Sequence, residues 1–458
     1  MSWFGWWSGS QNSFFGGIHP PESKERTAEV PIEVIPPPTE VRIALLQHLG
    51  AACELLVKPR AKVQWGEVIG RSDQFISAPV HASLAGTAMR ATVATLPNGR
   101  HVSVVPIQGA ESQPLAGSAL YDALLGGTWP LDGAEQFRPR EIMDAAREAG
   151  LVGMGGAAFP TFVKLRRQED QPVDTVLING CECEPCLTAD YRLMVEAPQP
   201  IVAGALLVRH ALGAQRVIVC VEDNKPLAVR ALRELEKAGV EVLVLKTKYP
   251  QGGERQLVKA ATGRVMPGGG LPVRVGVAVL NVATVAALAA AVYRGRPLTH
   301  RVVSVSGGGI RQPKNLLAPV GTSYRELIRW CGGLTPDAAR VIAGGPMMGF
   351  SIAADDEVAE KLPTPITKGT SGITVLTQQE VQRAEQTACL RCGRCVDVCP
   401  MQLVPTRLAL AARAKQRSLL ERYHIASCVE CGCCAYACPA SIPLVQLIRV
   451  GKIQFQNS

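Results

Sequence analysis

Two cysteine runs near the C-terminus constrain the fold of this chain more than any other feature. Each run has the form Cys-x₂-Cys-x₂-Cys-x₃-Cys-Pro, the first over residues 389–400 and the second over residues 428–439. Two-residue gaps let three thiolates surround one face of a [4Fe-4S] cube, while the fourth cysteine of the run binds the neighbouring cluster. The spacing therefore predicts two clusters, one held by Cys389, Cys392, Cys395 and Cys438 and the other by Cys428, Cys431, Cys434 and Cys399.

A pair of zinc sites or a disulfide framework is the alternative for such runs. Zinc sites usually combine two CxxC pairs and lack a third ligand followed by a trailing Cys-Pro. The fifteen cysteines show no framework of evenly spaced pairs outside the two runs. The pattern therefore favours iron–sulfur clusters, hence single-electron transfer, in a reducing compartment such as the cytoplasm.

The charge of the chain argues against a nucleic acid partner and leaves an acidic redox partner open. A net charge of +9 over 458 residues is modest and is not gathered into a nucleic-acid-binding tract, so we expect no nucleic acid partner. Between Cys389 and Lys452 there are nine Lys or Arg residues and three Asp or Glu residues. This excess offsets part of the negative charge of the clusters, and the remainder either steers an acidic redox partner or forms an ordinary solvated face.

Two segments bear on membrane association. Residues 1–7 hold Trp3, Phe4, Trp6 and Trp7 without the basic start and apolar core of a secretory signal; exposed Trp favours membrane interfaces or protein grooves, and a disordered tail fits equally well. Val275 to Tyr293 carries no formal charge, but it contains polar Asn281 and Thr284, which are costly in lipid. We expect a strand and a buried helix there, and a chain that is soluble yet docked at a membrane.

The first hundred residues predict a small β-rich domain. Short apolar runs between Phe14 and Gly109 are broken by Gly and Pro, after a stiff triple proline at 36–38. The pattern from Lys58 to Thr87 resembles the β-sandwich of lipoyl and biotinyl carriers. At the hairpin tip, where those carriers have their modified lysine, this sequence has His81-Ala82-Ser83. We therefore expect the sandwich without a swinging prosthetic arm.

Strand and helix patterns alternate in the middle of the chain. Thr175–Ile178, Val217–Val221 and Val240–Leu245 read as strands, with helices at Pro200–Leu212 and Pro226–Ala238. This order predicts an α/β unit with a parallel sheet. A short β-rich module follows Arg301, and a connector follows it.

A glycine-rich segment, 150–161, opens the α/β unit. Gly153-x-Gly155-x-x-Ala158 superficially matches a dinucleotide fingerprint, but a helical pattern, not a strand, precedes it. Such a loop still offers backbone N–H groups to a phosphate or a flavin, and Pro160 can open a helix that carries Lys164. The alternative is a bare glycine turn with Lys164 as a surface charge.

Four segments together resemble the NADH- and FMN-binding subunit of respiratory complex I, in the same order. They are the glycine loop, Val176–Pro185, Gly252-Gly253-Glu254 and Leu280–Thr284. The resemblance implies non-covalent FMN, NADH as substrate and Glu182 and Glu184 as catalytic acids that face the nicotinamide. The cofactor-binding residues that it implies are Gly153, Gly155, Gly156, Lys164, Asn179, Glu182, Glu184, Gly253, Glu254, Asn281 and Thr284.

The order of domains narrows the resemblance further. The segment Phe15-Gly-Gly-Ile-His-Pro-Pro-Glu-Ser-Lys24, followed by sandwich, flavin fold and two-cluster region, resembles the RnfC (RsxC) subunit of the Rnf electron-transport complex over essentially the whole chain. This implies an NADH-dependent oxidoreductase subunit of an ion-translocating complex, peripheral on the cytoplasmic face of the bacterial inner membrane. Its implied partners are membrane subunits, a ferredoxin-like subunit and, through the complex, ferredoxin or flavodoxin.

The predicted architecture is accordingly multidomain α/β. We expect an N-terminal tail and linker (1–38), a lipoyl-like barrel-sandwich (39–110) and an FMN/NADH-binding α/β domain (130–298). A β-grasp module (299–352), a connector (353–384) and an α-helical two-[4Fe-4S] ferredoxin-like domain (385–450) complete it.

Two alternative functions remain open, and one position departs from the complex I pattern. The rivals are a cobalamin reductase of bacterial microcompartments, with similar flavin and cluster domains, and a non-catalytic electron-transfer adaptor with a vestigial flavin site. Cys181 stands where the complex I pattern has an acid, and Cys181-x-Cys183-x₂-Cys186 has a spacing that could hold a metal.

Overall fold

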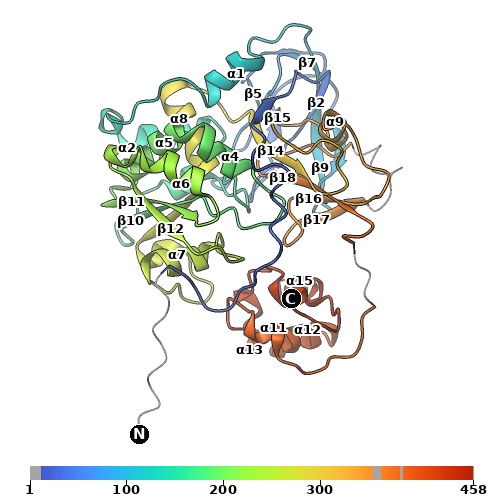
Figure 1. The fold of residues 1–458 in the computed structure, drawn as a ribbon. Coiled ribbons are helices and arrows are strands. Elements are labelled where there is room, and N and C mark those ends of the chain that lie inside the picture. Colours follow the sequence, from blue (N-terminus) through green and yellow to red (C-terminus); the bar gives the residue numbers. More distant parts are fainter. Residues whose placement is uncertain (1–11, 354–362, 382–384, 457–458) are drawn as a thin grey trace.

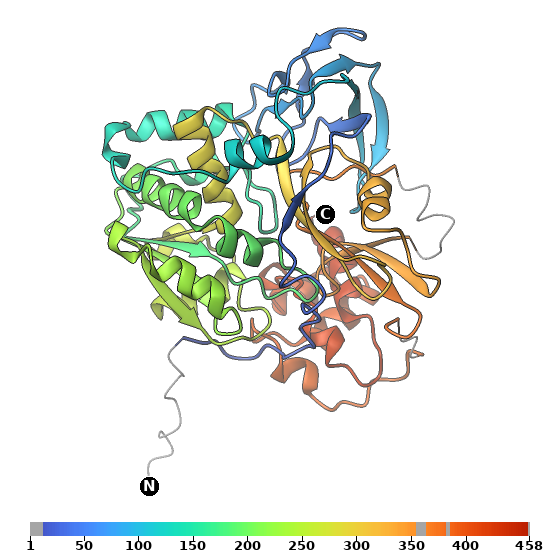
Figure 2. The same cartoon turned by 45° about the horizontal axis from the view of Figure 1, so that its top comes forward.

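The computed structural model describes residues 12–353, 363–381 and 385–456 (Figures 1 and 2). The aromatic residues at 3–7 and the membrane role predicted for them lie outside the described residues. Among the described helices, none has the length and apolar character that a membrane crossing requires.

The N-terminal domain is a sandwich of two small antiparallel sheets. The first contains β2 (Glu40–Ala44), β9 (His101–Gly109), β7 (Gly86–Ala88), β4 (Lys62–Val63) and β8 (Thr92–Thr95), and the second contains β3 (Glu54–Leu55), β5 (Val68–Arg71) and β6 (Val80–His81). Ile43, Ile69 and Ile107 are fully buried between them. Alternating apolar residues on short strands explain this core.

The predicted hairpin tip of this sandwich is buried against another domain. His81, Ala82 and Ser83 are at most 4% exposed. The Ser83 hydroxyl donates to the carbonyl of Val320, 2.6 Å away, in the β-rich module. A prosthetic arm therefore has no exposed place to swing from at this tip.

The α/β domain contains a four-stranded parallel sheet in the order β12-β11-β10-β13. Its strands are β10 (Thr175–Asn179), β11 (Arg216–Glu222), β12 (Glu241–Leu245) and β13 (Val277–Asn281). The strands confirm the predicted parallel unit: β10, β11 and β13 are buried apolar runs, and β12 is a half-buried edge strand.

Helices α5 (Pro198–Leu212) and α8 (Val282–Arg294) pack side by side over one face of the sheet. Their Ala and Gly residues allow a close approach: a Cβ on Gly204 would collide with the Val285 carbonyl. The other helices of the domain are α1 (Gly117–Leu124), α2 (Pro139–Glu148), α3 (Thr161–Lys164), α4 (Ala189–Glu196), α6 (Pro226–Arg233) and α7 (Glu254–Thr262).

The β-rich module forms a mixed six-stranded sheet in the order β1-β15-β14-β18-β16-β17, flanked by α9 (Tyr324–Trp330). Its strands are β1 (Ile32–Val34), β14 (His300–Ser306), β15 (Lys314–Pro319), β16 (Ala338–Ala343), β17 (Phe350–Ala353) and β18 (Gly372–Thr377). Two of them come from segments that the sequence predicts as linkers: β1 lies in the N-terminal tail, and β18 lies in the connector. The connector prediction is therefore wrong for β18, which sits between β14 and β16.

The C-terminal domain is helical, with α11 (Arg394–Asp397), α12 (Pro405–Arg413), α13 (Arg417–Arg422), α14 (Cys433–Tyr436) and α15 (Leu444–Gln456). Its two cysteine runs share one backbone geometry. In each run a left-handed glycine, Gly393 or Gly432, precedes the short helix. Two residues earlier in each run, Arg391 and Glu430 have φ of 54° and 55°. The duplication predicted from the cysteines thus extends to the backbone.

The N-terminal segment crosses between domains. In both views it runs from the cluster domain up to the β-rich module (Figures 1 and 2). The Gly17 N–H donates to Val398 of the cluster domain at 2.9 Å, while Ile18 and Tyr249 of the α/β domain exchange two backbone hydrogen bonds. Residues 14–24 are therefore an interdomain strap, not a free tail.

Candidate functional site

The predicted site residues converge where the strand order of the parallel sheet reverses. The chain moves outward from β10 to β11 and β12, then returns to place β13 on the other side of β10. Asn179 ends the central strand β10, Asn281 ends the neighbouring edge strand β13, and the two lie opposite each other in register. Ligands of open parallel sheets bind outside the carboxyl ends of the strands at such a reversal.

The glycine loop lies against the end of β13. It is closed by a bridge between Val152 and Pro160. Gly155 and Gly156 are exposed, and a Cβ on Gly156 would meet no atom within 4 Å. The Thr284 hydroxyl accepts the Met154 N–H at 2.9 Å. The loop is therefore anchored at Met154, while Gly155 and Gly156 are open to solvent.

Gly155 touches the Asn281 side chain directly. A Cβ at Gly155 would lie 2.9 Å from Asn281 Nδ2, so a larger residue would displace that amide. Asn281 Oδ1 accepts the Ala283 N–H at 2.9 Å and caps α8. Its Nδ2 donates to Asp190 Oδ2 at 2.5 Å.

Lys164 reaches the same region from the helix that Pro160 opens. Its ammonium group donates to Glu254 Oε1 at 3.1 Å and to the Val279 carbonyl at 3.0 Å. Both side chains of the ion pair are about one-third exposed (35% and 38%), so the ammonium can exchange partners with a bound anion. Lys164 is thus not an isolated surface charge.

Asn179 links the central strand to the start of α7. Its Nδ2 donates to the Gly252 carbonyl at 2.9 Å, and its Oδ1 accepts the Cys181 N–H at 3.1 Å. Gly253 stands immediately before α7. Beside it, the fully buried Gln251 has neither of its side-chain amide atoms in a hydrogen bond. The site therefore borders an unsatisfied polar group.

Glu182 is held by the protein backbone. Its two oxygens accept the N–H groups of Asp190 and Tyr191 at 3.0 and 3.1 Å, at the start of α4. A carboxylate at a helix N-terminus is stabilised by these free donors and by the helix dipole. The structure therefore gives Glu182 a capping role that the sequence did not predict.

Glu184 is also engaged, but with another domain. Its Oε1 accepts the N–H groups of Met347 and Met348 at 2.6 and 3.0 Å. Burial raises the pKa of Glu184, and the hydrogen bonds from Met348 and Met347 oppose that rise. The carboxylate lies at the contact between the α/β domain and the loop that follows β16, against Gly345.

Lys24 of the strap orders the loop that bears both acids. Its buried ammonium group donates to the carbonyls of Glu182, at 2.7 Å, and Glu184, at 3.0 Å, and also to that of Leu187. Burial lowers the pKa of Lys24, while the charge of Glu182 opposes that shift. The family-like strap segment thus fixes the geometry of residues 182–187.

The residues present fit FMN. The exposed amides of Gly155 and Gly156 and the Lys164 ammonium suit a phosphate, and the carboxamides of Asn179 and Asn281 suit a polar ring edge. Space beside Gly156 and the orphan amide of Gln251 are both consistent with a group bound at this end of the sheet.

The surroundings of two cysteines agree with the sets that the spacing predicts, and the assignment of the eight ligands stays a prediction. Burial raises the pKa of Cys395, and the nearby thiols Cys438 and Cys389 raise it further. Burial likewise raises the pKa of Cys434, with Cys431, Cys428 and Cys399 as its charged neighbours. Cys399, Cys428, Cys431 and Cys434 also line one cavity. Thiols from both runs thus lie near one another, and thiolates are the donors that a [4Fe-4S] cluster requires.

The two sets face different surroundings. Cys389 and Cys392 are exposed, whereas Cys399, Cys431 and Cys434 are buried. The buried set lies at the contact with the α/β domain, where the Tyr249 hydroxyl donates to the Cys431 carbonyl at 2.7 Å. A Cβ on Gly432 would meet the Met347 carbonyl at 2.9 Å. Tyr249 and Met347 therefore connect the Glu184 region to the set that contains Cys431.

In the described part of the chain, the side chains of Cys181, Cys183 and Cys186 are not gathered as ligands of one metal ion. Across the described ranges, no group of three or more His, Cys, Asp or Glu side chains has the arrangement of a single-metal site. Burial raises the pKa of all three thiols, to about 12 for Cys183 and about 11 for Cys186. Cys181 and Cys186 are buried in the loop, and Cys183 is half-buried.

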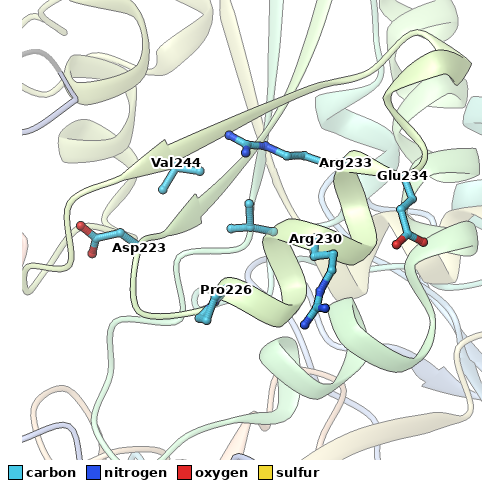
Figure 3. Close-up of a pocket in the computed structure, with 7 residues that line it drawn as sticks. Asp223, Pro226, Arg230, Arg233, Glu234 and Val244 are labelled. Carbon is cyan, nitrogen blue, oxygen red and sulfur yellow. The ribbon is translucent and has the colours of Figure 1, made fainter.

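A surface hollow lies elsewhere, beside α6 and the edge strand β12 (Figure 3). It holds none of the predicted site residues. Its lining consists of Asp223, Pro226, Val229, Arg230, Arg233, Glu234 and Val244.

Sequence reasoning missed Asp190, Tyr249 and Lys24. Each forms hydrogen bonds with a residue that is distant in sequence, so no local motif predicts its partner. The available signal was position: Tyr249 precedes the Gly252-Gly253 segment, and Lys24 ends the family-like strap.

Comparison with known families matches all four domains. Residues 12–111 match the RnfC barrel sandwich hybrid domain, 146–290 the Nuo51 FMN-binding domain, 302–351 the SLBB domain and 388–442 the 4Fe-4S dicluster domain. With the geometry above, these matches define an iron–sulfur flavoprotein that carries FMN and two [4Fe-4S] clusters.

Similar curated proteins span nearly the whole chain. The C subunit of the proton-translocating ferredoxin:NAD(+) oxidoreductase complex of Clostridium ljungdahlii is 41% identical over 95% of this chain and 93% of its own length. The corresponding subunit of the Na(+)-translocating complex of Acetobacterium woodii is 40% identical, covering 96% of both chains. That of the ion-translocating oxidoreductase complex of Rhodobacter capsulatus is 40% identical over 96% of this chain and 82% of its own. The chain therefore belongs to the RnfC family of ion-translocating ferredoxin:NAD(+) oxidoreductase complexes, and is one member of a multisubunit assembly.

Proposed function

We propose that this chain oxidises NADH at the strand reversal and delivers single electrons to its cluster domain. FMN, when bound, supplies the exchange between a two-electron hydride and single electrons, and the [4Fe-4S] clusters carry those electrons. The protein's part is to bind both cofactors, orient them and hold the two domains together.

The FMN site that we propose is the one predicted from the sequence. Gly153, Gly155 and Gly156 present backbone amides, Lys164 meets the phosphate, and Asn179 and Asn281 contact the flavin. Thr284 and Gly253 shape the backbone on either side. Support comes from the convergence of these residues at one end of β10 and β13, although the segments that carry them are spread over more than a hundred residues of sequence.

The proposed NADH-binding side of the site depends on three acidic residues. We propose that Glu184 and Glu254 lie at the edge where NADH meets the flavin. Glu182, as the cap of α4, supports that edge through Asp190 and Tyr191. Because Glu184 and Glu254 now hold protein groups, binding of the nucleotide requires at least one of them to change partner.

The observation that carries the proposal is the docking of one cysteine set on the flavin domain. Cys399, Cys428, Cys431 and Cys434 stand next to Tyr249 and Met347, which adjoin Glu184. We propose that this set receives electrons first. The set of Cys389, Cys392, Cys395 and Cys438, with its exposed thiols, then faces the next carrier.

The partners follow from the family. We propose that the chain lies peripherally on the cytoplasmic face of the bacterial inner membrane, bound to membrane subunits and to a ferredoxin-like subunit. Ferredoxin or flavodoxin is the other redox partner, and ions cross through other subunits. The exposed Arg391 and Arg394 beside Cys389 and Cys392 suit an acidic carrier.

Anaerobically purified protein tests the proposal. It should bind FMN and reduce ferricyanide with NADH as donor. If dithionite reduces the clusters but the chain retains no FMN and does not oxidise NADH, the only remaining function is that of a non-catalytic electron-transfer adaptor.

A further inference from the structure

The side chain of one acidic residue beside the flavin site, Asp190, has no role in the function proposed above, which uses only its backbone N–H. Asp190 lies in the first turn of α4 and is partly exposed. Its Oδ2 accepts a hydrogen bond of 2.5 Å from Asn281 Nδ2, which comes from the end of β13. Helix α4 and strand β13 are about ninety residues apart in sequence, so this contact exists only in the folded site.

The contact fixes the rotamer of Asn281. Its side-chain oxygen is already committed to the Ala283 N–H. With Nδ2 held by Asp190, both ends of the carboxamide are bound, and the amide cannot flip. Removal of the Asp190 carboxylate leaves Nδ2 without this acceptor.

The Asn281 side chain in turn limits where the glycine loop can lie. The Gly155 Cα approaches it so closely that even one added methyl group would lie 2.9 Å from Nδ2 and 3.1 Å from Cβ and Cγ. A shift of the amide therefore changes the position of the Gly155 backbone.

Asp190 is itself held rigidly. Its backbone N–H donates a hydrogen bond to Glu182 Oε1 at 3.0 Å. Arg301, from β14, donates to the Met154 carbonyl of the glycine loop at 3.1 Å and partly offsets the charge of Asp190. The charged groups that face Asp190 are Glu182, Arg301 and Lys24, and burial beside Glu182 raises its pKa to about 7.

We propose that Asp190 is a positioning residue of the flavin site, which holds the Asn281 carboxamide against Gly155 and so sets the place of the glycine-loop amides that bind FMN. This inference rests on the proposed function, because it concerns the same site. It predicts a hydrogen-bond role, not a role in covalent chemistry.

Two substitutions at one position test it in the full-length, cluster-loaded protein. In Asp190→Ala the acceptor is lost, and FMN affinity, measured by quenching of flavin fluorescence on reconstitution, should fall roughly tenfold or more. In Asp190→Asn the amide oxygen can still accept from Asn281 Nδ2, so affinity and the visible circular dichroism of bound FMN should return towards those of the unsubstituted chain.

Asp174→Ala is the matched control. Asp174 stands immediately before β10, at the opposite end of the sheet, and pairs with Arg264 at 2.9 Å. It should lower the thermal midpoint at least as much as Asp190→Ala without changing FMN affinity.

The outcomes separate the two proposals. Equal FMN affinity in Asp190→Ala and the unsubstituted chain would overturn the positioning role while leaving the flavin site intact. An Asp190→Asn variant that binds FMN no more tightly than Asp190→Ala would also overturn the positioning role. An unsubstituted chain that binds no FMN would instead overturn the proposed function itself.

Discussion

The charged side chains around the site bind backbone groups more than they bind one another. Glu182 and Glu184 together accept four N–H groups, from the start of α4 and from the loop after β16, and Lys24 donates to three carbonyls of residues 182–187. A buried charge is tolerated when such partners replace water. Substitution of any of these residues therefore alters loop geometry as well as local charge.

Glu184→Gln separates charge from geometry at the nucleotide edge. The Gln oxygen can still accept the Met347 and Met348 N–H groups, so the loop should stay in place and FMN absorbance should be kept. We expect most NADH-dependent ferricyanide reduction to be lost, because the variant lacks the carboxylate that we propose for the nucleotide edge. Dithionite should still reduce the clusters. Unchanged NADH oxidation would restrict Glu184 to holding the two domains together.

Lys164→Ala tests the phosphate end of the flavin site. A charge-assisted hydrogen bond contributes roughly 1.5–3 kcal/mol, so FMN retention after dialysis should fall at least about tenfold. Lys259→Ala is the control, since Lys259 lies near the far end of α7, the helix that begins at Glu254, and donates to the Gly263 carbonyl at 3.0 Å. Full flavin occupancy in the Lys164 variant would show that the phosphate lies elsewhere.

At the scale of elements, the sequence predicted those that are marked by a nearly uninterrupted apolar run. Strands β10 and β13 and helices α5 and α8 were predicted to within a few residues, although β10 pairs with β13 and α5 packs on α8 across a long stretch of sequence. Strands β1 and β18 were missed, since each is a short run whose partner lies far away: β1 pairs with β15, and β18 pairs with β14 and β16. For the same reason the sequence located the glycine loop and Lys164 but not the Asp190–Asn281 contact.

Strand β14 begins with a histidine that gives stability a pH dependence. His300 is buried, and burial lowers its pKa from 6.5 to about 3. The folded state therefore binds fewer protons than the unfolded state between these values, so the contribution is full above pH 6.5 and falls as pH drops towards 3. In His300→Gln the thermal midpoint should decline less steeply between about pH 6.5 and 5 than in the unsubstituted chain. An equal slope would assign the dependence to other groups, such as His81, whose pKa burial lowers similarly.

At the scale of the whole molecule, the strap and Tyr249 determine which cysteine set lies against the α/β domain. The strap passes the Cys399 carbonyl at Gly16 and pairs with Tyr249 at Ile18. Tyr249 then bonds the Cys431 backbone. These contacts tie the cluster domain to the α/β domain at a point far from the covalent connection that precedes Cys389. The orientation of the clusters is thus built by segments at both ends of the sequence.

The loss of one cysteine ligand should therefore affect the reduction of the clusters by NADH differently in the two sets. Anaerobically prepared protein should contain about eight iron atoms per chain. Cys392→Ser should remove one electron paramagnetic resonance signal, and NADH should still reduce the cluster bound by Cys399, Cys428, Cys431 and Cys434. In Cys431→Ser, NADH should no longer reduce the cluster at Cys389 quickly, although dithionite should.

Tyr249→Phe is the control for this comparison, because it keeps all eight ligands and removes only the hydroxyl that binds the Cys431 carbonyl. It should retain full iron and lose about 1 kcal/mol of interdomain hydrogen bonding, with a smaller slowing of cluster reduction by NADH than in Cys431→Ser. Equally fast reduction of the exposed cluster by NADH in Cys431→Ser would show that electrons reach Cys389 and Cys392 by a path that bypasses the docked set. Tightly bound zinc, with no iron after anaerobic reconstitution, would contradict the assignment of both sets.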